Sequence, residues 1–237
     1  MLLTLTTITV VYAKDQHDTK FVTYTKDITG DDKPDKISIS GIHKGKKYKN
    51  LEINIVTSKD KKYGIPLSGN QKPTVSFKDL NYDGTKDLFV SSTDFKGKNA
   101  IENHLYSFKN DQFTNIGLPE SLSLTAQLEN NYLASIVIDQ TGNEYRIDVK
   151  NKKQSLDRTG LYQNGRLNEP TELIVHSFSQ INPVRLRDMK FGLKGSQTIG
   201  DSYTGATIAN VFSIWKWSNG RWELQKTVVK KSRNKKI

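Results

Sequence analysis

Residues 27–35 read D-I-T-G-D-D-K-P-D, and residues 79–87 read D-L-N-Y-D-G-T-K-D. Both nonapeptides place an oxygen-bearing side chain at positions 1, 3, 5 and 9. These side chains belong to Asp27, Thr29, Asp31 and Asp35 in the first copy, and to Asp79, Asn81, Asp83 and Asp87 in the second. Calcium takes about six to eight oxygen ligands, and alternate positions of a tight loop can point such side chains inward. The pattern therefore predicts two calcium loops.

Position 7 of each loop, Lys33 or Thr85, would contribute its backbone carbonyl, and Gly30 or Gly84 would ease the turn. Neither loop has the length, the terminal Glu or the flanking helical periodicity of a helix-loop-helix calcium site, so both belong in a β context. The alternative is that both are turns that cap hairpins, because Asp and Gly are common in turns in any case.

The two copies are separated by about fifty residues, with the same offset for each aspartate, and an alternating apolar run follows each copy at 36–42 and 88–92. An internal repeat of this period indicates a repeated supersecondary unit. Residues 21–93 resemble the FG-GAP/VCBS-type repeat, in which a D-x-[DNT]-x-D-x-x-x-D loop joins two strands of a propeller blade, and more loosely the secreted VCBS-repeat proteins of Gram-positive bacteria. The resemblance implies Ca²⁺ bound by the eight side chains named above.

Strand patterns dominate the rest of the chain, so we expect an all-β protein. The Asn-Gly pairs in Q-N-G-R (163–166) and S-N-G-R (218–221) predict tight hairpins. The strands group into four units at about 20–68, 73–118, 122–167 and 171–229, and four strands per unit is the blade arrangement of a propeller. We expect a β-propeller-like domain at 14–229 with about four blade-like four-stranded units, which could close into a ring. The alternative is two blade-like units packed on a separate β-domain.

The N-terminal run M-L-L-T-L-T-T-I-T-V-V-Y-A resembles the remnant of a signal peptide cleaved after Ala13, with a buried first strand as the alternative. The chain has no cysteine, which excludes disulfides, a thiol nucleophile and cysteine-bound metal. An exported protein without disulfides suits a Gram-positive bacterium. We therefore expect a secreted or cell-surface-associated monomer with no transmembrane segment.

The formal net charge is +11, which favours an anionic partner. Lysines cluster at 44–49, at 59–62 and in a basic tail at 230–237, and we expect Lys44, Lys46, Lys47, Lys49, Lys59, Lys61 and Lys62 to form one basic face. No nucleic-acid-binding motif is present. For an exported protein the expected partners are an anionic cell-wall polymer, a polysaccharide or a surface protein.

No catalytic motif stands out, because the four histidines lack zinc-site spacing and G-D-S-Y-T-G at 200–205 lacks the nucleophile-elbow pattern. The sequence therefore predicts a secreted, non-catalytic calcium-binding protein that attaches to cell-surface or extracellular polymers. One alternative is an extracellular or wall-associated hydrolase whose acidic residues form no visible motif. Another is a carbohydrate-binding module that uses Trp215, Trp217 and Trp222. The hairpin W-K-W-S-N-G-R-W would pair Trp217 with Trp222 across its strands and place Trp215 on the same face. We expect these indoles to form a packed inter-blade core, and a sugar-stacking face is the alternative.

Overall fold

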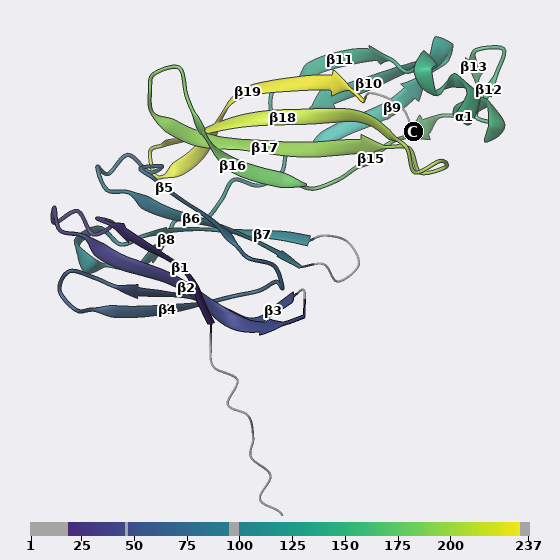
Figure 1. Cartoon of the computed structure of the whole chain (residues 1–237). Coiled ribbons are helices and arrows are strands. Elements are labelled where there is room, and N and C mark those ends of the chain that lie inside the picture. The colour runs from purple at the N-terminus through teal and green to yellow at the C-terminus, as the bar shows by residue number, and fades with distance from the viewer. Residues whose placement is uncertain (1–18, 46, 95–99, 233–237) are drawn as a thin grey trace, which may run out of the picture.

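The structure, a computed structural model, describes the chain except residues 1–18, 46, 95–99 and 233–237 (Figure 1). The described residues form antiparallel sheets, so the all-β prediction is confirmed. Helical segments among them are short: α1 (Lys153–Arg158), η1 (Lys109–Asp111), η2 (Asn130–Tyr132) and η3 (Lys150–Lys152). The expected signal segment 1–13 lies outside the described residues, and so does the tail beyond Ser232.

Two up-and-down sheets form the N-terminal half. The first has the order β1-β2-β3-β4, with β1 (Thr19–Lys26), β2 (Asp35–Lys44), β3 (Lys47–Val56) and β4 (Lys62–Leu67). The second has the order β5-β6-β7-β8, with β5 (Thr74–Lys78), β6 (Asp87–Asp94), β7 (Ala100–Ser107) and β8 (Thr114–Asn115). Each acidic loop joins the first two strands of its sheet, at the same topological position.

The C-terminal half does not repeat this meander. One sheet has the order β11-β10-β9-β14, from β9 (Leu124–Glu129), β10 (Leu133–Ile138), β11 (Asn143–Asp148) and β14 (Thr171–Glu172). A small hairpin joins β12 (Tyr162–Gln163) to β13 (Arg166–Leu167). The last sheet has the order β15-β17-β18-β19, and β16 also pairs with β17. Its strands are β15 (Ile174–Val175), β16 (Gln180–Arg185), β17 (Phe191–Gly200), β18 (Thr207–Ser218) and β19 (Arg221–Lys231). The described strands show no closed ring of blades.

The second sheet is the middle layer of the molecule, between the first sheet and the C-terminal half (Figure 1). Successive side chains of a strand point to opposite faces, and β6 carries apolar residues on both. Leu88 and Val90 pack with the isoleucines of the first sheet, whereas Phe89 packs into the C-terminal core. Burial on both faces explains the continuous apolar run in β6.

The Asn-Gly hairpins are confirmed. Asn164-Gly165 lies between β12 and β13, and Asn219-Gly220 lies between β18 and β19, with all four residues at positive φ. Positive φ at both central residues is the requirement of a type I′ turn, which matches the twist of the flanking strands. The predicted cross-strand pair of Trp217 with Trp222 is also present.

The prediction that seven lysines form a single basic face is wrong. Lys47 and Lys49 lie at the start of β3, whereas Lys59, Lys61 and Lys62 lie beyond its far end, and a ten-residue strand spans roughly 30 Å. The side chains of Lys44 and Lys46 lie outside the described residues. The basic tail is also shorter than expected, because β19 continues to Lys231.

Candidate metal loops and the adjoining cavity

Asp87 ties the start of the second loop to its end. It is the first residue of β6 and is 0% exposed. Its Oδ2 accepts hydrogen bonds from the backbone N–H groups of Leu80 at 2.7 Å and Asn81 at 3.1 Å. One carboxylate oxygen therefore closes a loop whose ends are seven residues apart.

The other polar side chains of this loop hold successive backbone amides. Asp79 Oδ2 accepts from the N–H of Gly84 at 3.1 Å, and Gly84 has φ +88°, a region that glycine enters without strain. Asn81 Oδ1 accepts from the N–H of Asp83 at 3.1 Å, and Asp83 Oδ1 accepts from the N–H of Thr85 at 2.8 Å. These contacts wind the chain tightly around the aspartates.

Three carboxylates of the second loop share one electrostatic neighbourhood. Burial is the main cause that raises the pKa of Asp87 to about 7; the charges of Asp83 and Asp79 act in the same direction, and the two backbone hydrogen bonds oppose them. Oδ1 of Asp79 and Oδ1 of Asp87 are buried and have no hydrogen-bond partner among the described residues. A buried oxygen without a partner is destabilising unless a donor or a cation satisfies it. The donor chemistry of this loop fits a hard cation.

The arrangement is nevertheless not a finished coordination sphere. Within the described chain, no group of three or more His, Asp or Glu side chains is already disposed to hold a metal ion. The Asn81 side-chain amide donates to Asp83 Oδ2 at 2.9 Å, and Lys109 Nζ lies 3.9 Å from Asp83 Oδ1 while donating to the Asp83 carbonyl. A cation at this loop therefore requires the Asp83 carboxylate to turn away from Asn81 and Lys109.

The first loop satisfies its carboxylates internally. Asp35 Oδ2 accepts from the N–H groups of Ile28 at 2.8 Å and Thr29 at 3.1 Å, as Asp87 does in the second loop. Its Oδ1 accepts from the N–H of Ser58 at 2.8 Å, in the turn after β3. Thr29 Oγ1 also donates to Asp35 Oδ2, at 3.3 Å. Both oxygens of Asp35 therefore have donors, whereas one oxygen of Asp87 has none.

Asp31 and Asp27 of the first loop are also partnered. The Ser58 hydroxyl donates to Asp31 Oδ2 at 2.5 Å, the Lys33 N–H donates to its Oδ1 at 3.1 Å, and Lys59 Nζ lies 3.9 Å away. The hydrogen bond from Ser58 holds the pKa of Asp31 below its usual range. Asp27 accepts N–H groups on both of its oxygens. The structure brings the predicted ligands of this loop together, but protein donors already fill them.

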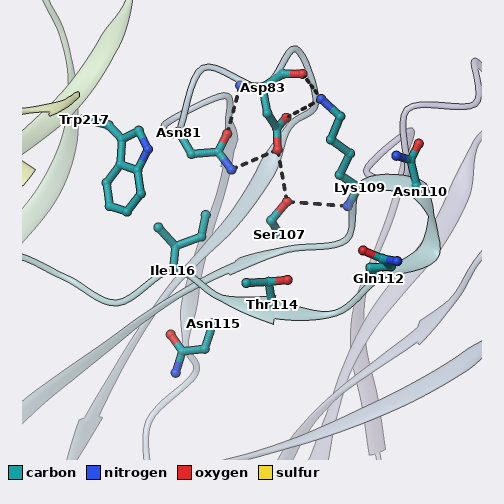
Figure 2. Close-up of a pocket in the computed structure, with 10 residues that line it drawn as sticks. All are labelled: Asn81, Asp83, Ser107, Lys109, Asn110, Gln112, Thr114, Asn115, Ile116 and Trp217. Carbon is teal, nitrogen blue, oxygen red and sulfur yellow. Dashed lines mark hydrogen bonds and ion pairs between the residues drawn. The ribbon is translucent and has the colours of Figure 1, made fainter. Parts of the chain in front are cut away.

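A cavity of about 480 Å³ opens beside the second loop (Figure 2). Asn81 and Asp83 line it from the loop, Ser107 to Ile116 line it from the β7–β8 hairpin, and Trp217 lines it from β18. Ser107 Oγ donates to Asp83 Oδ2 at 3.5 Å. No sequence motif predicts this cavity, because Trp217 lies more than one hundred positions from the other lining residues and only the fold brings them together.

The three tryptophans do not form one platform. Trp215 is 8% exposed and packs in the C-terminal core, where its Nε1 donates to Ser213 Oγ at 2.8 Å. Trp222 packs against that core, and its Nε1 donates to the Gly117 carbonyl at 3.2 Å. Trp217 meets Trp222 edge to face, with ring centroids 5.2 Å apart, and faces the cavity. Core packing, the favoured interpretation of this hairpin, holds for Trp215 and Trp222, whereas the alternative of three indoles on one sugar-binding face is wrong.

A second groove, of about 580 Å³, lies on the last sheet, and four of its nine lining residues are basic. Arg185, Arg187 and Lys226 line it without an ion pair to any described residue, whereas Lys216 lies 2.6 Å from Asp188. The hydrogen bond from Lys216 lowers the pKa of Asp188. This groove presents more positive charge than its acidic residue neutralises.

In the described residues, no helix has the length and apolar character needed to cross a membrane.

The chain is similar to one protein family and to one relative described below. Residues 122–230, which correspond to the C-terminal half from just before β9 into β19, match the family described as the YybI C-terminal domain. A relative from Bacillus subtilis, described as uncharacterized protein YybI, is 23% identical over 213 residues, which cover 86% of this chain and 81% of the relative. No solved structure matches. The chain is thus similar to YybI over most of its length, and the matched family domain coincides with the half of the fold that departs from the N-terminal repeat.

Proposed function

We propose that this protein is a secreted, non-catalytic calcium-binding protein that attaches to cell-surface or extracellular polymers. The observation that carries the proposal is the pair of buried, unpartnered oxygens, Oδ1 of Asp79 and Oδ1 of Asp87, beside the Asp83 carboxylate. In this proposal the sheets β1–β4 and β5–β8 are propeller-type units, each built around one acidic loop.

The second loop is the calcium site in this proposal. Asp79, Asn81, Asp83 and Asp87 would contribute side-chain oxygens, and Thr85 would contribute its carbonyl. A bound cation would neutralise the mutual repulsion of the three carboxylates and fix the turn between β5 and β6. The first loop holds the same shape with Ser58 and Lys59 in place of an ion, so it needs no calcium to fold.

Calcium titration by isothermal calorimetry tests this assignment. The wild-type protein should bind one calcium ion per chain, Asp83→Ala should abolish binding, and the matched change in the first loop, Asp31→Ala, should leave it intact. Loss of binding in Asp31→Ala but not in Asp83→Ala would reverse the assignment of the loops. Absence of calcium binding by the wild-type protein would reject the proposed metal function.

Electrostatics support attachment to an anionic polymer. The net charge is +11, and the groove of Arg185, Arg187 and Lys226 offers cations that no described carboxylate neutralises. Retention on an anionic wall polymer should weaken steeply as salt rises through physiological strength, where the Debye length is about 8 Å. An Arg185→Ala/Arg187→Ala variant should elute at lower salt than wild type. Retention that salt does not change would contradict an electrostatic attachment.

The hydrolase alternative gains less support from the two concave sites. Hydrolysis of a glycoside commonly needs two carboxylates that flank the bond to be cleaved. The cavity beside the second loop contributes Asp83 and the basic groove contributes Asp188, and each of these lies within 4.0 Å of a lysine Nζ. These sites are better suited to binding than to acid–base chemistry.

A further inference from the structure

The cavity between the second loop, the β7–β8 hairpin and β18 has one charged residue of each sign. Asp83 and Lys109 are the two, and they contact each other, since Lys109 Nζ donates to the Asp83 carbonyl and lies 3.9 Å from its carboxylate (Figure 2). Their charges offset one another inside the cavity. The remaining lining residues are amides, hydroxyls, Ile116 and Trp217. A ligand that fits this lining is polar but uncharged.

The β7–β8 side of the cavity offers side-chain hydrogen-bonding groups that have no partner among the described residues. The side chains of Asn110, Gln112 and Thr114 are exposed, and no described residue hydrogen-bonds to them. Together they provide donors and acceptors, because an amide supplies both and a hydroxyl supplies both. Such a set can bind a ligand that carries several hydroxyl groups.

The opposite side is apolar and aromatic. Trp217 is half-buried, its ring is held edge to face by Trp222, and its indole N–H has no partner in the described chain. Figure 2 shows the indole beside Asn81 and Ile116, across the cavity from Gln112. A fixed indole offers a flat apolar surface at low entropic cost, together with one donor at its edge.

We propose that this cavity binds a neutral sugar unit of an extracellular polysaccharide. The apolar C–H face of the ring packs on Trp217 and Ile116, and the ring hydroxyls bond to Asn110, Gln112 and Thr114. The volume of about 480 Å³ lies inside the range of about 300 to 1,000 Å³ that is usual for ligand pockets. The inference deepens the proposed attachment function, on which it rests, by adding to the anionic contact at the basic groove a second contact that takes a neutral sugar.

The sugar site and the calcium loop share two residues, Asn81 and Asp83. Calcium that turns the Asp83 carboxylate away from Lys109 would also change the position of this carboxylate in the cavity wall. Coupling between two sites is reciprocal for equilibrium affinities, so calcium should change saccharide affinity by the same factor by which saccharide changes calcium affinity.

Indole NMR signals give a direct test with the intact protein. The chain has three tryptophans, so a ¹H–¹⁵N spectrum contains three indole signals, and Trp217→Phe identifies the one from Trp217. Chitotetraose, cellotetraose and maltotetraose serve as neutral probes, and polyphosphate serves as the anionic probe. At least one neutral oligosaccharide should shift the Trp217 signal and leave the buried Trp215 signal in place.

Affinity measurements on variants complete the test. Trp217→Ala should weaken neutral-oligosaccharide binding at least about tenfold, and Gln112→Ala about fivefold, as expected for the loss of an aromatic contact and of one hydrogen bond. The side chain of Gln112 is exposed and makes no hydrogen bond in the described chain, and the backbone bond from its N–H to the Lys109 carbonyl does not depend on the side chain, so the variant should fold like wild type. Tyr203→Ala removes an aromatic residue that is 53% exposed and does not line the cavity, and it should bind normally.

The outcomes separate this inference from the proposed function. Calcium binding without a shift of Trp217 by any neutral probe would overturn the saccharide site and leave the calcium proposal standing. Saccharide binding without calcium binding would do the reverse. Binding of polyphosphate at Trp217, or binding of neutral probes that Trp217→Ala and Gln112→Ala do not weaken, would also overturn the assignment.

Discussion

Two aspartates at the same position of a repeated motif occupy different environments. Asp35 and Asp87 each close their loop by accepting two backbone N–H groups on Oδ2. Ser58 then satisfies Oδ1 of Asp35, whereas Oδ1 of Asp87 has no described partner. The sequence predicted both as metal ligands because the spacing is the same. It could not distinguish them, since Ser58 reaches the first loop from a turn more than twenty positions away.

Asp87 should make the calcium-free protein less stable as pH rises. The folded state keeps the Asp87 proton up to about pH 7, whereas an unfolded chain releases it near pH 4. The folded state therefore binds more protons between these values, and the free energy of unfolding should fall from about pH 4 to about pH 7. Urea unfolding in EGTA at several pH values measures this slope.

Asp87→Asn is the matched control for that slope, because the amide has no proton to release in this range. The variant should lose this component of the pH dependence. A slope that is the same in Asp87→Asn and in wild type would assign it to other groups.

Asp35→Ala should destabilise the first loop strongly. The change removes the acceptor of three backbone N–H groups, those of Ile28, Thr29 and Ser58. The N–H of Thr29 keeps Asp27 Oδ1 as an acceptor at 3.2 Å, so the N–H groups of Ile28 and Ser58 are the two left without a partner. Each costs about 1 kcal/mol or more, so a loss of roughly 2 kcal/mol is expected in urea unfolding. Glu120→Ala, which removes an exposed carboxylate, should change stability by less than about 0.5 kcal/mol. A small effect of Asp35→Ala would show that these hydrogen bonds contribute little.

Among the strands, the local turn patterns predicted the hairpins correctly, whereas the pairings between strands distant in sequence differ from the four predicted units. Asn164-Gly165 and Asn219-Gly220 form the predicted hairpins because their turn chemistry is local. The expected third and fourth units failed to appear as separate four-stranded meanders, since β14 leaves the fourth range to pair with β9 of the third. Such pairings depend on packing between sheets, which the spacing of residues along the chain does not predict.

The tryptophan hairpin should show a graded response to truncation. Trp215→Ala empties a core position and should cost about 3 to 5 kcal/mol, in the range of buried aromatic truncations. Trp217 is half-buried at the cavity, so Trp217→Ala should cost clearly less, about 1 kcal/mol. Chemical denaturation of the two variants checks this order. Equal losses would mean that Trp217 is as much a core residue as Trp215.

At the scale of the whole molecule, the middle sheet belongs to two cores. Leu88 and Val90 of β6 pack toward the first sheet, and Phe89 packs toward the C-terminal half. Tyr82 adds a polar link across the same boundary, because its hydroxyl donates to the Phe191 carbonyl at 2.6 Å. Burial of this residue raises its pKa to about 12. The repeat predicted two related sheets, but it could not predict that one of them would also serve the C-terminal core.

Sharing of the middle sheet should make unfolding cooperative. Melting of either neighbour exposes one apolar face of β6, so calorimetry should record a single transition rather than two. Phe89→Ala should lower the midpoint and uncouple the halves, because it removes the aromatic side chain by which β6 packs into the C-terminal core. Two well-separated transitions in the wild-type protein would contradict a shared core.

Thermal melting in calcium and in EGTA at pH 7.5 shows directly whether the folded protein binds calcium. A ligand that binds the folded state alone stabilises it by about 2.7 kcal/mol at one hundred times its Kd. For a chain of this size that corresponds to an increase in Tm of roughly 5 to 10 °C. We predict this increase for the wild-type protein and for Asp31→Ala, and none for Asp83→Ala. Superimposable wild-type melts in saturating calcium and in EGTA would contradict calcium binding by the folded protein.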